Sequence, residues 1–169
     1  MNLTTIGAMS CNPAIGGVAK GQILREIDAL GGMSGRISDR SAIQFRMLNR
    51  SKGPAMWSPR TQNDRHAFAN EWRMTLEAHP NIHLWQDMVT SLLIQNGAVC
   101  GVRTQLGVDI RAQSTILTSG TFLQGRIHLG NQQFQGGRSG ERAADGITQQ
   151  LAEHGFLTGR MKTGTPPRI

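Results

Sequence analysis

A two-residue turn signal, Asn96-Gly97, constrains most strongly what this chain can fold into. It separates two runs rich in β-branched and apolar residues, Val89–Ile94 and Ala98–Arg103. An Asn-Gly pair between two such runs is typical of a tight β-hairpin. A third run, Val108–Ala112, follows within a few residues. The sequence therefore predicts a three-stranded antiparallel meander over about residues 89–112.

The apolar spacing outside the meander alternates between helical and extended patterns. Residues 18–30 and 63–78 repeat apolar side chains at helical spacing, and each run ends near glycine or proline. Residues 146–154 show the same pattern over a shorter length. The short apolar runs 82–85 and 114–118 predict strands. This mixture predicts an α/β fold with an inserted antiparallel meander.

The charge of the chain favours an anionic partner. Lys and Arg number 18 against 11 Asp and Glu, a net charge of +7. Such an excess is typical of proteins that bind RNA, although a solvated basic surface explains it equally well. With aromatic residues at 5% and no Tyr, the sequence argues against a base-stacking platform. Seven basic residues lie in the polar stretch 34–65: Arg36, Arg40, Arg46, Arg50, Lys52, Arg60 and Arg65.

Several classes of protein are disfavoured by composition. No apolar run approaches the roughly 20 residues of a membrane span, and the first residues lack a signal-peptide pattern. Two cysteines imply no disulfide framework, which fits a reducing compartment. The five histidines show no metal-ligand spacing, so we predict no metal site. We expect a cytoplasmic protein without membrane contact, or a mitochondrial one in a eukaryotic relative.

Cys11 lies in a glycine-rich segment, Met9–Gly17, just ahead of the first predicted helix. The N-terminus of a helix favours a thiolate or a bound anion, so Cys11 is a candidate nucleophile. The alternative is a packed, unreactive cysteine, which is the commoner state of a single thiol. The local sequence leaves both interpretations open.

The predicted strand 114–118 runs directly into a Ser-Gly-Thr turn. Dinucleotide-binding folds place ligands at the carboxyl ends of their strands, so Thr118, Ser119 and Gly120 are candidate cofactor contacts. An ordinary glycine turn is the alternative. The chain contains no G-x-G-x-x-G segment of the kind that opens such folds. Either the chain starts after that segment, or it binds no dinucleotide.

Five segments, taken together, carry a resemblance to a known family. They are Met9–Gly17 (MSCNPAIGG), Gln44–Ala55 (QFRMLNRSKGPA), Leu117–Leu123 (LTSGTFL), Gly136–Ser139 (GGRS) and Lys162–Ile169 (KTGTPPRI). In this order they resemble the MnmG/GidA family of flavin-containing, tRNA-modifying proteins. The resemblance implies an incomplete FAD/NAD-linked-reductase (Rossmann-like) domain with a meander insertion. Residues 1–169 would then be a partial FAD-binding domain with no second complete domain.

The resemblance also implies a chemistry and a set of partners. Family members are thought to add a 5-carboxymethylaminomethyl group to the wobble uridine of tRNA. They use FAD, with NADH as reductant and methylene-tetrahydrofolate as carbon donor. The implied partners are tRNA, the GTPase MnmE and a second copy of the full-length chain.

The family's functional residues fall on named positions of this sequence. The proposed catalytic cysteine of the family falls on Cys11. The backbone contact to the adenine of FAD falls on Val89. The turn near the flavin and pyrophosphate falls on Thr118, Ser119 and Gly120. The basic stretch becomes a candidate surface for tRNA or for folate, through Arg46, Arg50, Lys52, Arg60 and Arg65.

Two alternatives remain beside this interpretation. One is the related tRNA uridine methyltransferase family that also uses folate and FAD, although the SCNPAIGG and KTGTPPRI segments favour the first family. The other is a truncated, non-catalytic RNA-binding remnant, suggested by the missing glycine segment. On its own, we expect the 169-residue chain to be inactive and to bind FAD weakly or not at all.

Overall fold

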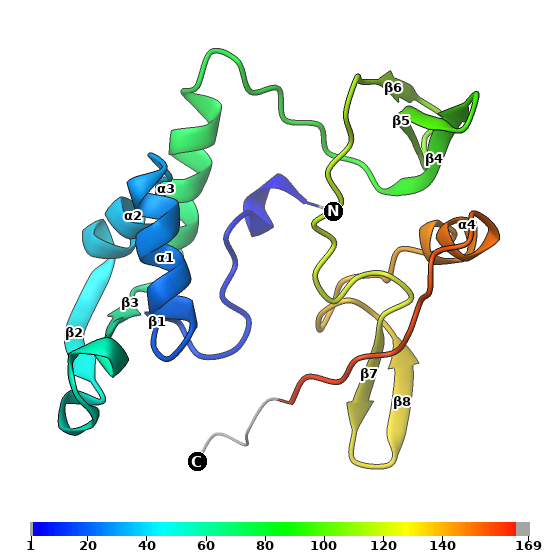
Figure 1. The fold of residues 1–169 in the computed structure, drawn as a ribbon. Helices are drawn as coiled ribbons and strands as arrows, with labels where there is room; N and C mark the ends of the chain where they lie inside the picture. Colours follow the sequence, from blue (N-terminus) through cyan, green and yellow to red (C-terminus); the bar gives the residue numbers. More distant parts are fainter. Residues whose placement is uncertain (1, 165–169) are drawn as a thin grey trace. The chain divides into compact units, whose positions relative to one another are not determined.

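The computed structural model describes residues 2–164, which form two compact units, Asn2–Trp85 and the part from Gln86 onward (Figure 1). The last five residues of the Lys162–Ile169 motif lie outside the described residues. Helices and antiparallel sheets occur together, so the predicted α/β fold class is confirmed.

The first unit places three helices beside a small antiparallel sheet of order β1-β3-β2 (Figure 1). Strand β3 is central and pairs with a strand on each side. In chain order the elements are η1 (Leu3–Thr5), β1 (Ala14–Gly16), α1 (Lys20–Ala29), α2 (Ser34–Arg40), β2 (Ala42–Leu48), η2 (Arg50–Lys52), η3 (Pro54–Met56), β3 (Ser58–Asn63) and α3 (Arg65–Glu77).

The two helices predicted in this unit are confirmed, and their ends have identifiable causes. Helix α1 stops where the N–H of Gly31 bonds to the carbonyl of Asp28 and the N–H of Gly32 bonds to that of Ile27. Helix α3 begins at Asp64, whose carboxylate accepts hydrogen bonds from the N–H groups of His66 and Ala67, both at 2.8 Å.

A buried polar residue, Asn63, joins the sheet to α2. It is 1% exposed, and its amide nitrogen donates to the Ser38 carbonyl at 2.7 Å and to the Ser41 hydroxyl at 2.9 Å. Its amide oxygen accepts from the Thr61 hydroxyl at 2.8 Å. Because all three bonds are buried, the position of β3 relative to α2 is set by hydrogen bonding as well as by apolar contact.

The apolar core of the first unit is small. Ile37 on α2 is fully buried, and Phe68 on α3 is 5% exposed. The Phe68 ring meets the Trp72 ring edge to face, with centroids 6.4 Å apart. These residues hold α2 and α3 in the same unit.

The second unit contains the predicted meander, β4 (Val89–Gln95), β5 (Ala98–Thr104) and β6 (Asp109–Arg111), in that order. Asn96 and Gly97 both have positive φ, as a two-residue hairpin turn requires. A second hairpin, β7 (Arg126–Leu129) with β8 (Gln132–Gln135), was not predicted. The predicted helix 146–154 is confirmed as α4 (Ile147–Glu153).

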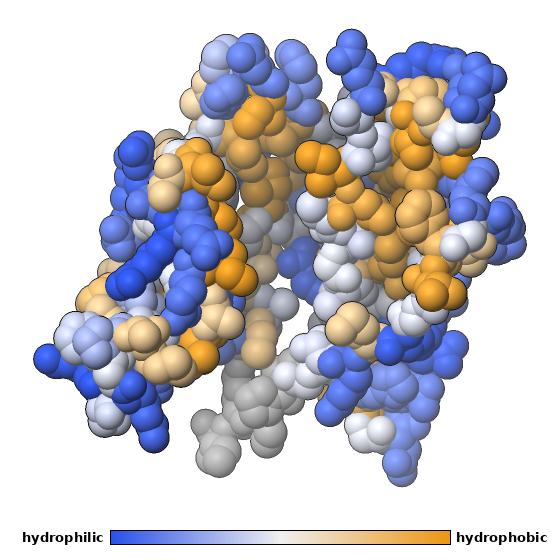
Figure 2. Space-filling model, in the orientation of Figure 1, coloured by the Kyte–Doolittle hydropathy of each residue, from blue (hydrophilic) through white to orange (hydrophobic). Residues whose placement is uncertain are grey.

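Helix α4 attaches to the edge of the meander through a side-chain amide. The oxygen of the Gln150 side chain accepts from the N–H of Leu92 at 2.7 Å, and its nitrogen donates to the Leu92 carbonyl at 2.9 Å. Ile147, one turn earlier, is 2% exposed. Figure 2 shows apolar surface, in orange, over the meander and α4.

Two predicted strands, 82–85 and 114–118, are wrong. A strand needs a neighbouring backbone for its hydrogen bonds. Among residues 2–164, no strand pairs with either segment. Ile116 is accordingly 85% exposed and Trp85 57% exposed. The apolar pattern of each run is present, but the pairing partner is not.

Candidate functional site

The loop that carries Cys11 is fastened to the end of β3 and the start of α3. The guanidinium of Arg65 donates to the carbonyl oxygen of Cys11 at 3.0 Å. The N–H of Asn63 donates to the Pro13 carbonyl at 2.7 Å, and the Gln62 amide donates to the Asn12 side chain at 3.1 Å. Three residues within one short segment thus hold the cysteine loop in place.

The structure does not place the N-terminus of a helix directly after Cys11, as the sequence predicted. Strand β1 intervenes, and α1 begins only at Lys20. The loop bonds instead to Arg65, the first residue of α3. Cys11 is partly buried. The cationic side chain of Arg65 is therefore a charged group bonded to this loop.

The five candidate basic residues separate into three groups. Arg65 has a structural bond to the cysteine loop. Arg50 and Lys52 lie on the η2 turn. Arg46 on β2 and Arg60 on β3 are direct partners in the sheet register. The structure brings the last pair together, although fourteen positions separate them in the sequence.

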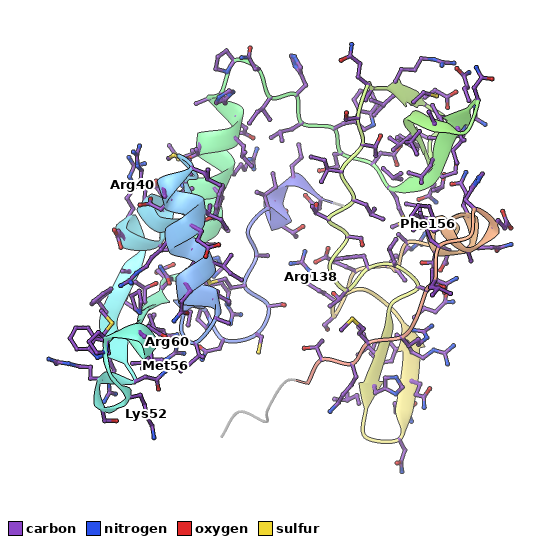
Figure 3. All side chains as sticks on the ribbon, viewed as in Figure 1. Arg40, Lys52, Met56, Arg60, Arg138 and Phe156 are labelled. Carbon is purple, nitrogen blue, oxygen red and sulfur yellow. The ribbon has the colours of Figure 1, made fainter. Side chains whose placement is uncertain are left out.

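An open hollow of about 650 Å³ follows the end of β2. Its lining runs continuously from Phe45 to Ser51 and includes Arg46 and Arg50. The indole N–H of Trp57 donates to the Arg50 carbonyl at 3.2 Å, which holds the turn at one end of the hollow. Figure 3 shows Lys52 and Arg60 at the end of the first unit that carries η2 and η3.

Val89 lies at the start of β4, which is an edge strand of the meander. It is the register partner of Thr104, and the Met88 carbonyl just before it accepts from the N–H of Gln105 at 2.7 Å. Successive residues of a strand direct their backbone groups to opposite sides. The N–H and C=O of Val89 therefore face the outer edge of β4, away from β5.

Asp87 shapes the turn that precedes Val89. Its carboxylate accepts from the N–H groups of Met88 and Leu106, at 2.7 and 3.2 Å. A hydrogen bond from the Thr104 side chain, together with these two N–H groups, lowers the pKa of Asp87. Sequence reasoning missed this residue, because a single Asp before a strand carries no distinctive signal.

Thr118, Ser119 and Gly120 lie in an exposed turn that is bonded to the GGR segment. The Ser119 carbonyl accepts from the N–H of Phe122 at 3.1 Å, and the Thr121 hydroxyl donates to the Gly137 carbonyl at 2.6 Å. A side chain at Gly120 would meet open space. The turn thus has a fixed base and an accessible backbone.

Arg138 supports this turn and was not predicted as a functional residue. Its guanidinium lies 5.2 Å from the centre of the Phe122 ring and 2.9 Å from the Glu141 carboxylate. Ala144, further along, exchanges backbone hydrogen bonds with Phe122 and Gln124. The GGR motif itself was the only sequence signal for these contacts.

Two further searches cover the described part of the chain. No group of three or more His, Cys, Asp or Glu side chains among residues 2–164 is placed to hold a metal ion. Within the same residues, every helix is too short or too polar to cross a membrane.

Comparison with known proteins identifies relatives along the whole chain. A protein named tRNA uridine 5-carboxymethylaminomethyl modification enzyme MnmG, from Cytophaga hutchinsonii, is 69% identical over 169 residues, which are 100% of this chain and 27% of the relative. The protein of the same name from Flavobacterium johnsoniae is 65% identical over 100% of this chain and 27% of the relative. The chain therefore spans about a quarter of the length of these relatives.

Solved structures show the same relationship. GidA from Aquifex aeolicus superimposes with a TM-score of 0.92 at 45% identity, over 98% of this chain and 28% of that one. A GidA-related protein from Thermus thermophilus superimposes with a TM-score of 0.53 at 26% identity, over 70% of this chain and 52% of that one. The family model described as glucose inhibited division protein A matches residues 1–169. This chain therefore belongs to the GidA family.

Proposed function

We propose that the chain forms part of an FAD-dependent enzyme that adds a 5-carboxymethylaminomethyl group to the wobble uridine of tRNA. One observation carries the proposal: the 69% identity, along the entire chain, to a relative named for this modification. In this proposal the two units belong to one partial FAD-binding domain, residues 1–169, with the meander inserted in it. The protein works in the cytoplasm.

The residues present fit a flavin dinucleotide. The outward N–H and C=O of Val89 form a donor–acceptor pair of the kind that an adenine edge can meet. The accessible backbone at Thr118, Ser119 and Gly120 suits a polar ligand. When bound, FAD supplies the oxidation–reduction chemistry. NADH is the proposed reductant, and methylene-tetrahydrofolate the proposed carbon donor.

Cys11 is the proposed nucleophile. Its thiolate adds to C6 of the uracil ring, which makes C5 nucleophilic toward the one-carbon unit. C5 bonds to the methylene carbon as a bond from that carbon to a folate nitrogen breaks, and loss of the C5 proton expels the thiolate and restores the ring. The amine of glycine then displaces tetrahydrofolate from the same carbon, which completes the carboxymethylaminomethyl group. The three hydrogen bonds that fasten the loop support this role, because a nucleophile must keep a fixed position relative to its substrate.

The proposed partners follow from the same assignment. They are tRNA, the GTPase MnmE and a second copy of the full-length protein. The net charge of +7 and the basic residues of the first unit support contact with tRNA. Folate is the second proposed ligand of that basic surface.

The test is complementation of a strain in which the gene is disrupted, followed by mass analysis of tRNA nucleosides. We expect the parent gene to restore 5-carboxymethylaminomethyluridine and Cys11→Ser to abolish it while the flavin content of the protein stays unchanged. Cys100→Ser is the matched control, because the Cys100 thiol donates to the Leu93 carbonyl within β4–β5, and it should restore the nucleoside.

Other outcomes would favour the alternatives. A methyl group in place of the larger substituent would support the folate-dependent methyltransferase. Loss of flavin together with loss of modification in Cys11→Ser would assign the cysteine a structural role. An intact mass near 18.4 kDa for the cellular protein, with no modification activity, would support the RNA-binding remnant.

A further inference from the structure

Arg46 and Arg60 lie directly opposite each other on adjacent antiparallel strands. Directly opposed residues share one face of a sheet, with Cβ atoms about 5 Å apart, and like charges in this arrangement repel. Arg60 is partly buried, which removes some of the water that would screen its charge. The fold therefore holds two cations together at a cost to its own stability.

The protein supplies no counter-charge for this pair within the part of the chain that the structure describes. Strands β1, β2 and β3 contain no acidic residue. None of the ion pairs formed among residues 2–164 involves Arg46 or Arg60. By contrast, Arg73 and Arg103 each have a carboxylate partner, at 2.6 Å. What sets Arg46 and Arg60 apart is their direct opposition in the sheet register, with no carboxylate bonded to either one.

The positions around the pair leave room for a ligand. On β1 the residue opposite Arg60 is Gly16, which places no side chain beside the guanidinium. The flanking pairs on the same face are Gln44 with Gln62 and Leu48 with Ser58, and none of these four side chains is charged. The face is therefore cationic, open and able to donate hydrogen bonds, which is the chemistry that an oxyanion requires.

We propose that Arg46 and Arg60 together hold one phosphate group of the RNA backbone. The inference rests on the proposed function, and it narrows the basic surface to a defined site. A phosphodiester suits the site better than an isolated carboxylate, because the hollow that includes Arg46 continues to Arg50, where a second phosphate of the same strand can be met. Each guanidinium donates to a different oxygen of the shared phosphate.

The test measures how the affinity for tRNA depends on salt concentration, with the gene product used in the form in which the cell makes it. In log–log form, the slope of affinity against salt falls by slightly less than one for each phosphate that the protein no longer neutralises. We expect the double variant to reduce the slope by about one, and each single variant by clearly less, because the remaining guanidinium still neutralises the shared phosphate. Two separate phosphate contacts would instead reduce it by about two in the double variant, and that result would overturn the proposal.

Controls separate folding and ligand identity from the effect of charge. Arg73→Gln removes the same charge from α3 and should leave the slope unchanged, because Arg73 is paired with Glu77. Arg46→Lys and Arg60→Lys keep the charge; they should keep the slope but weaken binding, since lysine cannot donate in the same paired geometry. An unchanged slope in the double glutamine variant would refute the phosphate site.

Two further results show where this proposal depends on the proposed function and where the two separate. If the parent protein binds no tRNA, both fail together. If the parent binds and modifies tRNA while the glutamine variants lose only a preference for folates with long glutamate tails, the proposed function stands and the oxyanion is a folate carboxylate. That last result would overturn the phosphate assignment.

Discussion

Asn63 offers the sharpest test of how the first unit is held together. The substitution Asn63→Ala removes the three buried hydrogen bonds to Ser38, Ser41 and Thr61. Each buried bond contributes roughly 1 kcal/mol, so the loss should lower the free energy of local unfolding by about 3 kcal/mol. Because 1.36 kcal/mol corresponds to a factor of ten, this predicts an increase of roughly 100-fold in the opening equilibrium.

Hydrogen–deuterium exchange followed by mass spectrometry of peptides from α2 and β2 measures this opening locally. Gln62→Ala is the matched control: it changes the adjacent residue and removes one exposed bond, so exchange should rise by less than about tenfold. Exchange in the α2 and β2 peptides of Asn63→Ala within about twofold of the parent would show that the apolar core alone holds these elements. The hydrogen-bonding argument would then be refuted.

Three further predictions concern single contacts. Gly16→Ala should destabilise the first unit by several kcal/mol, because its Cβ would collide with the Pro59 carbonyl. Gly53→Ala meets open space and should cost only its backbone strain, about 1–3 kcal/mol. Denaturant unfolding compares the two variants, and equal losses of stability would contradict the collision. The N–H groups of Ala67 and His66 lower the pKa of Asp64, so its contribution to folding stability is present above the unfolded-state pKa and is lost as pH falls through the folded-state value. The stability of Asp64→Asn, measured from pH 6 to pH 2, should therefore fall less steeply than that of the parent. Identical stability profiles would rule this out. Gln150→Leu should increase hydrogen exchange at the backbone N–H of Leu92. Gln149→Leu, which removes an exposed bond to Glu153, should not. An unchanged exchange rate at Leu92 in Gln150→Leu would show that the Gln150 side-chain amide is dispensable.

Elements with local causes could be predicted from the sequence. The meander follows from Asn96-Gly97, and the ends of α1 and α3 follow from Gly31 and Asp64. In each case the determining residues lie within a few positions of the element. Such signals do not depend on distant parts of the chain.

Elements that depend on distant pairing could not be predicted. Strand β3, Ser58–Asn63, has no apolar alternation, and it is extended because β1 and β2 pair with it on both sides. The strand predicted over residues 114–118 is wrong for the opposite reason, because this run has the apolar pattern but no neighbouring strand among the described residues. β-propensity describes the preference of a residue type, whereas a strand also requires a neighbouring strand with which to pair.

The candidate site shows the same division. The sequence indicated that Arg46 and Arg60 belong to a basic stretch, but only the register shows that they are opposed. The outward direction of the Val89 backbone likewise depends on the pairing of Met88 with Gln105. The roles of Cys11, Val89, Thr118, Ser119 and Gly120 stay predictions, because their test requires bound ligands and nucleoside analysis.

The amide of Gln150 has a consequence for self-association of the protein. An exposed strand edge recruits further strands, including those of other copies, because its N–H and C=O groups are unpaired. A strand added to cover β4 would create a new edge, whereas a side-chain amide saturates Leu92 and presents no backbone for continued growth. At the β4 edge the Gln150 side chain thus stops sheet extension at Leu92, and the outward backbone at Val89 stays open to a small ligand.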